Sequence, residues 1–187
     1  MDLAWKREAL LASPLLESLR PVLRQCPAAR FPAIADLDAL AGERGLRNAN
    51  DKAIRFVAQE PAKRGEFDSQ YEIRIFREGT VPTRSGNWHD LFNALDWIAF
   101  PRTKAEINRI HYREMTARRT SAGSRGTPRM EIGSRGTARD VLTLFDEGGA
   151  IVACGEPELA RLLREFRWKE LFWLERERVR QAMRFFA

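Results

Sequence analysis

The sequence is poor in the residues that build disulfide frameworks and metal sites. It holds two cysteines and two histidines among 187 residues. Cys26 and Cys154 both lie among apolar neighbours, so we interpret them as buried free thiols rather than as a disulfide framework. Neither a CxxC nor an HExxH spacing occurs, which excludes the zinc sites that these spacings mark.

Long apolar runs are also missing. No run approaches the ~18–20 residues that a membrane-spanning helix needs. The N-terminal sequence MDLAWKREALL has an acid at Asp2, and charges interrupt its apolar residues, which is unlike a secretory signal peptide. We therefore expect a protein without a transmembrane segment that resides in the reducing cytoplasm.

The composition is that of a globular protein with a basic balance. Hydrophobic residues make up 44% and charged residues 31% of the chain, and this length predicts a single domain, 1–187, with a substantial core. The net charge of +6 favours phosphates, anionic membrane surfaces or acidic partners. Basicity of this size is also common in proteins that bind no nucleic acid.

The most informative stretch is 81–111, VPTRSGNWHDLFNALDWIAFPRTKAEINRIH. Asn87 is a typical helix N-cap, with Asp90 three residues later as in a capping box. The predicted helix runs to about Phe100 and stops at Pro101, which has no backbone N–H to donate. A second helix is predicted from Thr103. The apolar stripe of the first helix is Trp88, Leu91, Phe92, Leu95 and Ile98.

Polar side chains gather on the opposite faces of these two helices. The first helix carries His89, Asn93 and Asp96 on one stripe, and the second carries Lys104, Asn108 and His111. A neutral imidazole can act as a general base or a metal ligand, and an asparagine can orient a water molecule or a phosphate. The alternative is structural: Asp90 caps the helix and favours its positive end, His89 is only a first-turn residue, and His111 lies on a solvated face.

Three strings carry a resemblance to a known family: VPTR–NWHDLFNALDWIAFPRTKAEIN, RDVLTLFDEGGAIV and FRWKELFW. They resemble the uncharacterised bacterial family catalogued as domain of unknown function 3025, over most of the chain from about Trp5. The resemblance names no reaction. The positions that it matches are Asn87, His89, Asp90, Asn93, Pro101–Lys104, Asn108 and Asp140–Glu147. It also implies that relatives continue beyond the equivalent of Ala187 with a basic, histidine-containing segment, so a site that uses this segment would be incomplete here.

The remaining pattern predicts an α+β fold. Its expected parts are N-terminal helices, a small mostly antiparallel sheet, a central helix pair broken at Pro101, and C-terminal helices from Pro157. Alternating residues predict strands at 54–58 and 71–76. A hairpin is predicted near 140–154, with the turn at Asp146–Gly149.

Residues 116–139 are rich in glycine, serine and arginine. The pentapeptide GSRGT occurs twice, and the segment 118–139 contains six arginines and a single acid, Glu131. Free backbone N–H groups and arginine charge can hold a phosphate, but the segment is more typical of a mobile basic surface loop, about 116–139. The absence of aromatics among these arginines argues against a stacking platform for single-stranded nucleic acid.

Two classes of function stay open. The first is an enzyme, a hydrolase or a phosphate-handling activity, with a polar centre at 87–93. Its catalytic residues would be His89 as base or metal ligand, Asp90 as the orienting carboxylate, and Asn93 as a substrate or water contact. Its substrate-binding or anion-binding residues would be Arg84, Arg102, Lys104, Asn108, His111 and Asp146. A divalent metal ion is a candidate cofactor.

The second class is non-catalytic. It is a module that binds nucleic acid or another polyanion, or a protein-interaction domain. The candidate partner of the enzyme or of the binding module is a phosphate-containing ligand or a nucleic acid. Binding by charge alone does not need a His–Asp–Asn set, so the sequence favours the enzyme slightly.

Overall fold

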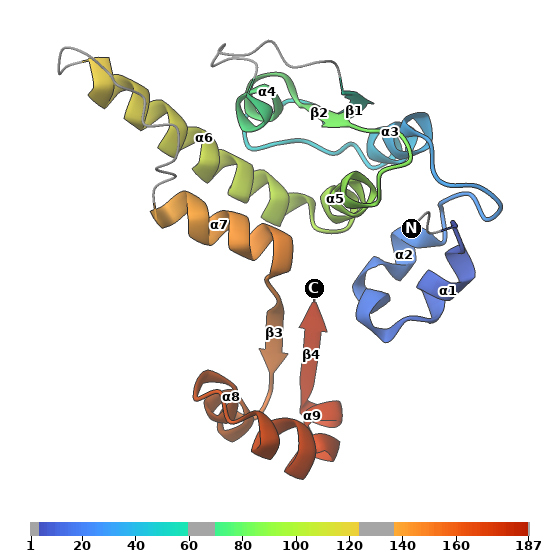
Figure 1. Cartoon of the computed structure of the whole chain (residues 1–187), viewed down its shortest axis with the longest axis vertical. Helices are drawn as coiled ribbons and strands as arrows, with labels where there is room; N and C mark the ends of the chain where they lie inside the picture. The colour runs from blue at the N-terminus through green and yellow to red at the C-terminus, as the bar shows by residue number, and fades with distance from the viewer. Residues whose placement is uncertain (1–3, 60–69, 124–136, 187) are drawn as a thin grey trace. The chain divides into compact units, whose positions relative to one another are not determined.

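The computed structural model describes residues 4–59, 70–123 and 137–186. The chain divides into two compact units, Met1–Asp146 and Glu147–Ala187, and each is described by itself. Figure 1 gives the order of the helices and strands along the chain. The expectation that all 187 residues form a single domain stays a prediction.

The first unit opens with helices, as predicted. They are α1 (Arg7–Ala12), the 3₁₀ helix η1 (Pro14–Leu19), α2 (Arg20–Leu23) and α3 (Ile34–Glu43). Pro14 is the first residue of η1, where its missing N–H costs no helical hydrogen bond. Leu19, Val22 and Leu23 are buried in the main core. α3 packs against the strand at 55–58, and η1, α2 and α3 pack against the helix at 88–99.

Two short parallel strands form the centre of this unit. β1 (Arg55–Ala58) pairs with β2 (Thr80–Thr83), and buried Phe56 lies opposite buried Val81. Gly79 precedes β2 with a φ of +79°, and a Cβ at this position would lie 2.0 Å from the carbonyl oxygen of Ala53. Only glycine fits this close approach without moving the backbone.

The strand predicted at 71–76 is wrong, because these residues begin the helix α4 (Tyr71–Glu78). Ile73 and Ile75 are both fully buried, although they point to different sides of a helix. Both are covered because α4 packs against a long helix, α6 (Pro101–Gly123), as well as against β2. Burial on two sides produced the alternation of apolar and polar residues that is typical of a strand.

The predicted helix pair at Pro101 is confirmed. α5 (Trp88–Ala99) ends before Phe100, which leaves the helical region with φ −125° and ψ 53°, and α6 begins at Pro101. Figure 1 shows α6 as a long rod and α5 nearly end-on, so the chain changes direction between them. Residues 116–123, which we assigned to the arginine-rich loop, are the last turns of α6.

The hairpin predicted near 140–154 is wrong in its first half. Residues 137–148 form the helix α7 (Thr137–Gly148), which places Asp146 in a helix instead of a turn. Val141, Leu144 and Phe145 follow the i, i+3, i+4 spacing of a helix. The second half is a strand, β3 (Ile151–Cys154), but it pairs with β4 (Met183–Phe186).

The second unit is small and mixed. Its elements are β3, α8 (Pro157–Arg164), the π-helix η3 (Glu170–Leu174), α9 (Arg176–Ala182) and β4. The C-terminal helices from Pro157 are confirmed. The core of this unit is Leu159, Leu162, Leu171, Val179 and Met183.

The α+β class is confirmed, although the described strands form one parallel pair and one antiparallel pair instead of a single mostly antiparallel sheet. Both cysteines are free thiols. Cys26 is buried as predicted, and burial is the main cause that raises the pKa of its thiol to about 11. Cys154 is only partly buried. Within the described ranges, no helix is both long and apolar enough to cross a membrane.

Candidate functional site

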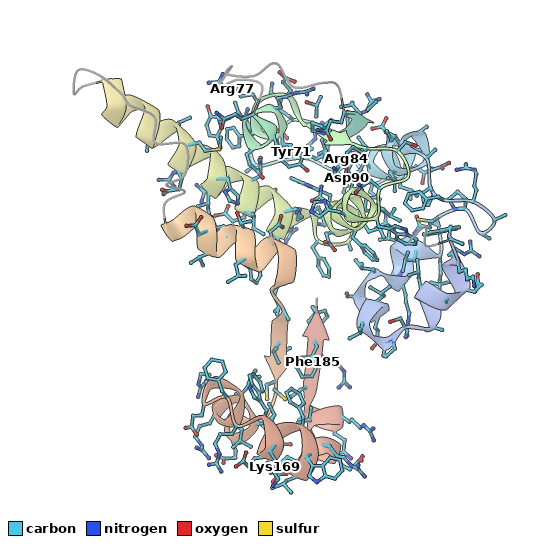
Figure 2. All side chains as sticks on the ribbon, viewed as in Figure 1. Tyr71, Arg77, Arg84, Asp90, Lys169 and Phe185 are labelled. Atoms are coloured by element: carbon cyan, nitrogen blue, oxygen red, sulfur yellow. The ribbon has the colours of Figure 1, made fainter. Side chains whose placement is uncertain are left out.

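The N-terminal end of α5 is built around the carboxylate of Asp90. Asn87 caps the helix, and its Oδ1 accepts a hydrogen bond from the backbone N–H of Asp90 (3.1 Å). Arg84 donates three hydrogen bonds to the same carboxylate, from its backbone N (2.7 Å), Nε (2.9 Å) and Nη2 (2.8 Å). Figure 2 shows Arg84 and Asp90 together at this end of the helix. The predicted cap is therefore real, and it also anchors the chain before α5.

Asp90 is ionised throughout the physiological range. The Arg84 guanidinium is the main cause that lowers the pKa of its carboxyl group to about 2, against the opposing effect of burial. Only 8% of the residue is exposed. An ionised carboxylate can only accept hydrogen bonds, so every neighbouring group must donate to it.

His89 completes this group, which we call the His89 cluster (Arg84, His89 and Asp90). Its Nδ1 lies 3.1 Å from Oδ1 of Asp90. Since the carboxylate accepts, Nδ1 carries the hydrogen of a neutral ring and Nε2 keeps its lone pair. About 70% of the His89 side chain is exposed. The ring is thus oriented by a buried carboxylate while its basic nitrogen can reach a ligand from solvent.

A second polar group lies deeper, between α4, α5, α6 and α7. We call it the Lys104 cluster (Tyr71, Asn93, Lys104 and Asp146). Nζ of Lys104 donates to Oδ1 of Asn93 (2.9 Å) and contacts both carboxylate oxygens of Asp146 (2.6 and 2.8 Å). Nδ2 of Asn93 donates to the hydroxyl of Tyr71 (2.8 Å). Lys104 is only 7% exposed, so a lysine ammonium is held inside the unit by these contacts.

Burial raises the pKa values of two groups near this ammonium. Desolvation is the main cause that raises the pKa of Asp96 to about 6; the charge of Lys104 lowers it and that of Asp146 raises it. Desolvation also raises the pKa of the Tyr71 hydroxyl, followed by the charge of Glu72 and, with smaller effects, those of Asp146 and Asp90. Tyr71 therefore senses the charge of a carboxylate from each cluster.

Asn108 and His111 follow Lys104 on the same face of α6. Both are buried, so the prediction that His111 lies on a solvated face is wrong. Nδ2 of Asn108 donates to the backbone carbonyl of Glu72 (3.0 Å) and to its Oε2 (2.6 Å). Its buried Oδ1 meets no hydrogen-bond donor in the part of the chain that the structure describes.

The structure sorts the predicted site residues into different surroundings. Arg84, His89 and Asp90 form one cluster, whereas Asn93 hydrogen-bonds to Lys104 and Tyr71 rather than to His89. Asp146 joins Lys104 from α7, forty-two residues away in sequence. Arg102 is exposed.

Tyr71 and Glu72 are two polar residues that the sequence did not connect with the site. Asp96 was placed on the helical stripe of His89 and Asn93 by its periodicity, but it was not assigned a role. Tyr71 and Glu72 were assigned to a strand, so no pattern connected them with α6. Among the described residues, no group of three histidine, cysteine, aspartate or glutamate side chains is placed to hold a metal ion.

The fold and the two clusters define an α+β protein with a buried lysine centre and an exposed, carboxylate-oriented histidine. Residues 54–187 match the family described as "Protein of unknown function (DUF3025)", and the chain belongs to this family. The match covers both clusters and confirms the resemblance predicted from the sequence over residues 54–187, whereas its expected start at about Trp5 stays a prediction. No curated protein and no solved structure matches the chain.

The proposed phosphate site at 116–139 lies mostly outside the described residues, since 124–136 are not among them. In the described part of the second unit, five arginines form ion pairs with glutamates: Arg161, Arg167, Arg176, Arg178 and Arg180. These charges are already matched locally, which weakens the case for polyanion binding on that surface.

Proposed function

We propose that this protein is an enzyme of the hydrolase or phosphate-handling type, with His89 as its general base. The observation that carries the proposal is the pairing of an exposed imidazole with a buried, ionised carboxylate at 3.1 Å. Asp90 fixes the ring and stabilises the imidazolium that forms when Nε2 takes a proton. This division of roles is the one that a base and its orienting carboxylate need.

Arg84 has two roles in this proposal. Its Nε and Nη2 hold Asp90, while the remainder of its half-exposed guanidinium stays beside the ring, where an anionic substrate group can bind. Arginine suits phosphate and carboxylate because its planar donors match their oxygens. Asn93 and Lys104 act here as positioning residues of the neighbouring cluster, since they bond to one another.

A divalent metal and a cytoplasmic location are part of the same proposal. His89 Nε2 is a suitable metal ligand, and two free thiols fit a reducing compartment. A metal at His89 would need further ligands from substrate, water or residues outside the described ranges.

The test is a thermal-shift and activity screen on four proteins. Wild type, His89→Ala, His89→Gln and the exposed control Glu43→Ala are melted with divalent metals, phosphate and nucleotides. In parallel they are assayed on a phosphate monoester and a carboxylic ester probe. A ligand that binds only the folded state raises the melting temperature with concentration.

We expect a ligand shift and a turnover in wild type and Glu43→Ala that both His89 variants lose. Loss of general-base catalysis costs about 10²–10⁴-fold in rate. If His89→Ala keeps every shift and every activity of wild type, His89 is a first-turn residue and the proposal fails.

A further inference from the structure

Residues 147–187 expose aromatic side chains that ring contacts join into a continuous surface. Phe166 lies 5.5 Å from Trp168, Trp168 lies 5.9 Å from Phe172, and Phe172 lies 6.2 Å from Phe185, between ring centroids. We call these four side chains the aromatic stripe. All of them are exposed. Scattered apolar side chains on a surface are normal, but a contiguous patch marks an interaction site.

Phe166 adopts a backbone conformation that is unfavourable for a residue other than glycine. Helix α8 ends in a Schellman motif, in which the N–H of Phe166 bonds to the carbonyl of Leu163 and the N–H of Arg167 to that of Leu162. Phe166 occupies the left-handed position with a φ of 55°, where glycine is the usual residue. Yet 73% of Phe166 is exposed, so burial of its ring within this unit does not offset the backbone strain.

The strand β4 carries the stripe to an open sheet edge. Phe185 lies opposite Val152, and Phe186 lies opposite Ile151, so apolar side chains occupy both faces at this end of the sheet. Ile151 and Phe186 are exposed. No other described strand pairs with the outer edges of β3 and β4. Two strands are fewer than a stable sheet normally has, and an open apolar edge is a template for a further strand.

The net charge of residues 147–187 favours one kind of partner for this surface. Residues 147–187 contain eight basic and seven acidic side chains, a formal +1, while the whole chain carries +6. The remaining residues therefore carry +5. Two copies of the chain repel each other least through 147–187. Residues 175–180 carry ion pairs such as Arg178–Glu175 and Arg180–Glu177. This surface therefore presents charges of both signs, which a surface that faces its own copy can complement.

We propose that residues 147–187 form a two-fold interface with the same residues of a second copy of this chain, centred on the aromatic stripe. Aromatic residues form the desolvated centre of such an interface, and the paired arginines and glutamates form its polar rim. The open edges of β3 and β4 allow the sheet to continue across the two-fold axis. This inference does not depend on the role of His89.

The test measures the mass of the full chain by sedimentation over a concentration series. We expect the mass to rise from 21.5 kDa to twice that value. Phe166→Gly removes a ring of the stripe but places the preferred residue in the left-handed position. It should raise the dimer dissociation constant by at least about tenfold, with an unchanged or higher melting temperature of the dilute monomer.

Two further variants complete the experiment. Trp168→Ala should weaken the dimer similarly, and Leu15→Ala, which alters an exposed leucine of the first unit, should leave it unchanged. A chain that stays at 21.5 kDa at every concentration overturns the proposal, and so does a dimer that both stripe variants leave intact. A monomer that floats with anionic phospholipid vesicles, and loses this in Phe166→Gly, overturns it in favour of a lipid surface.

Discussion

The His89 cluster and the Lys104 cluster use similar side chains in opposite surroundings. Each has a carboxylate paired with a cation, at 2.8 Å for Arg84–Asp90 and 2.6 Å for Lys104–Asp146. In the first pair the cation faces solvent and the carboxylate is buried; in the second the cation is buried and the carboxylate is the more exposed partner. The comparison separates a cluster that can reach a ligand from one that holds helices together.

The two clusters also differ in how their central side chains use their hydrogen-bonding groups. Lys104 uses its ammonium on Asn93 and Asp146, so its charge stabilises the junction of α5, α6 and α7. His89 uses one ring nitrogen on Asp90, and our proposal assigns the other nitrogen to a ligand. Mutation of Lys104 should therefore lower stability most, whereas mutation of His89 should change the ligand response and leave stability almost unchanged.

The largest effect is expected from Lys104→Met. It leaves the Asp146 carboxylate and the Asn93 amide without their cation, and removing one member of a buried ion pair costs about 3–5 kcal/mol. Because Asp146 is partly exposed, we expect about 2–4 kcal/mol of lost unfolding free energy. Urea denaturation measures it.

The matched control is the double variant Lys104→Met/Asp146→Leu. Replacing both partners by apolar residues removes the unpaired carboxylate, so it should recover most of the loss. A single variant that loses less than about 0.5 kcal/mol would show that the Lys104 cluster is not structural, and the comparison would break.

Asp96→Asn should act in the opposite direction. The folded pKa of Asp96, about 6, lies above the ordinary value for an aspartate, so the folded protein binds this proton more tightly than the unfolded chain does. Stability therefore falls as pH rises from about 4 to 6. We expect the variant to be about 1–3 kcal/mol more stable than wild type at pH 8.

The pH dependence supplies the control for this variant. At pH 4 the Asp96 carboxyl of wild type is protonated in the folded state, so the advantage of asparagine should shrink toward zero. Unfolding in urea at both pH values measures the difference. An advantage of the same size at pH 4 and pH 8 would exclude ionisation of Asp96 as its source.

Asp90→Asn should cost about 1–2 kcal/mol at neutral pH, allowing for solvent screening of Arg84. The folded pKa of Asp90, about 2, lies below the unfolded value, so its contribution is fully present above about pH 4. The contribution is lost as pH falls toward 2. Denaturation at pH 6 and pH 2.5 should show the gap between variant and wild type closing, and a constant gap would contradict the ionised pair.

The smallest stability effect is expected from His89→Ala. An exposed side chain away from the core changes the unfolding free energy by less than about 0.5 kcal/mol. The ligand shift of the thermal screen should nevertheless disappear. A variant that loses stability like Lys104→Met would place His89 in the structural class and remove the distinction between the clusters.

Local signals predicted the parts of the fold that local physics decides. Asn87 caps α5 through its own side chain, and Pro101 separates α5 from α6, as the sequence indicates. α4 was misread because Ile73 and Ile75 are buried by different neighbours, which is a tertiary cause. α7 was misread because the glycines after Asp146 are equally typical of a turn and of the end of a helix.

The site followed the same division. Helical spacing grouped Lys104, Asn108 and His111 on one face of α6, but it could not show that α4 and α7 cover this face. The contact between Lys104 and Asp146 joins residues far apart in sequence, and no periodicity encodes such a pair. Residues of the His89 cluster were found because Arg84, His89 and Asp90 are close in sequence.

Because Lys104 is buried, its chemical labelling rate reports how often α7 moves away from it. Lys6, Lys52 and Lys169 are exposed and should react with an amine-selective reagent at the speed of a free amine. Lys104 can react only in molecules where Asp146 has moved away from it, so its labelling rate follows the frequency of that local opening. Mass spectrometry of a labelling time course would thus reveal how often α7 leaves the helices beneath it while the rest of the protein stays folded.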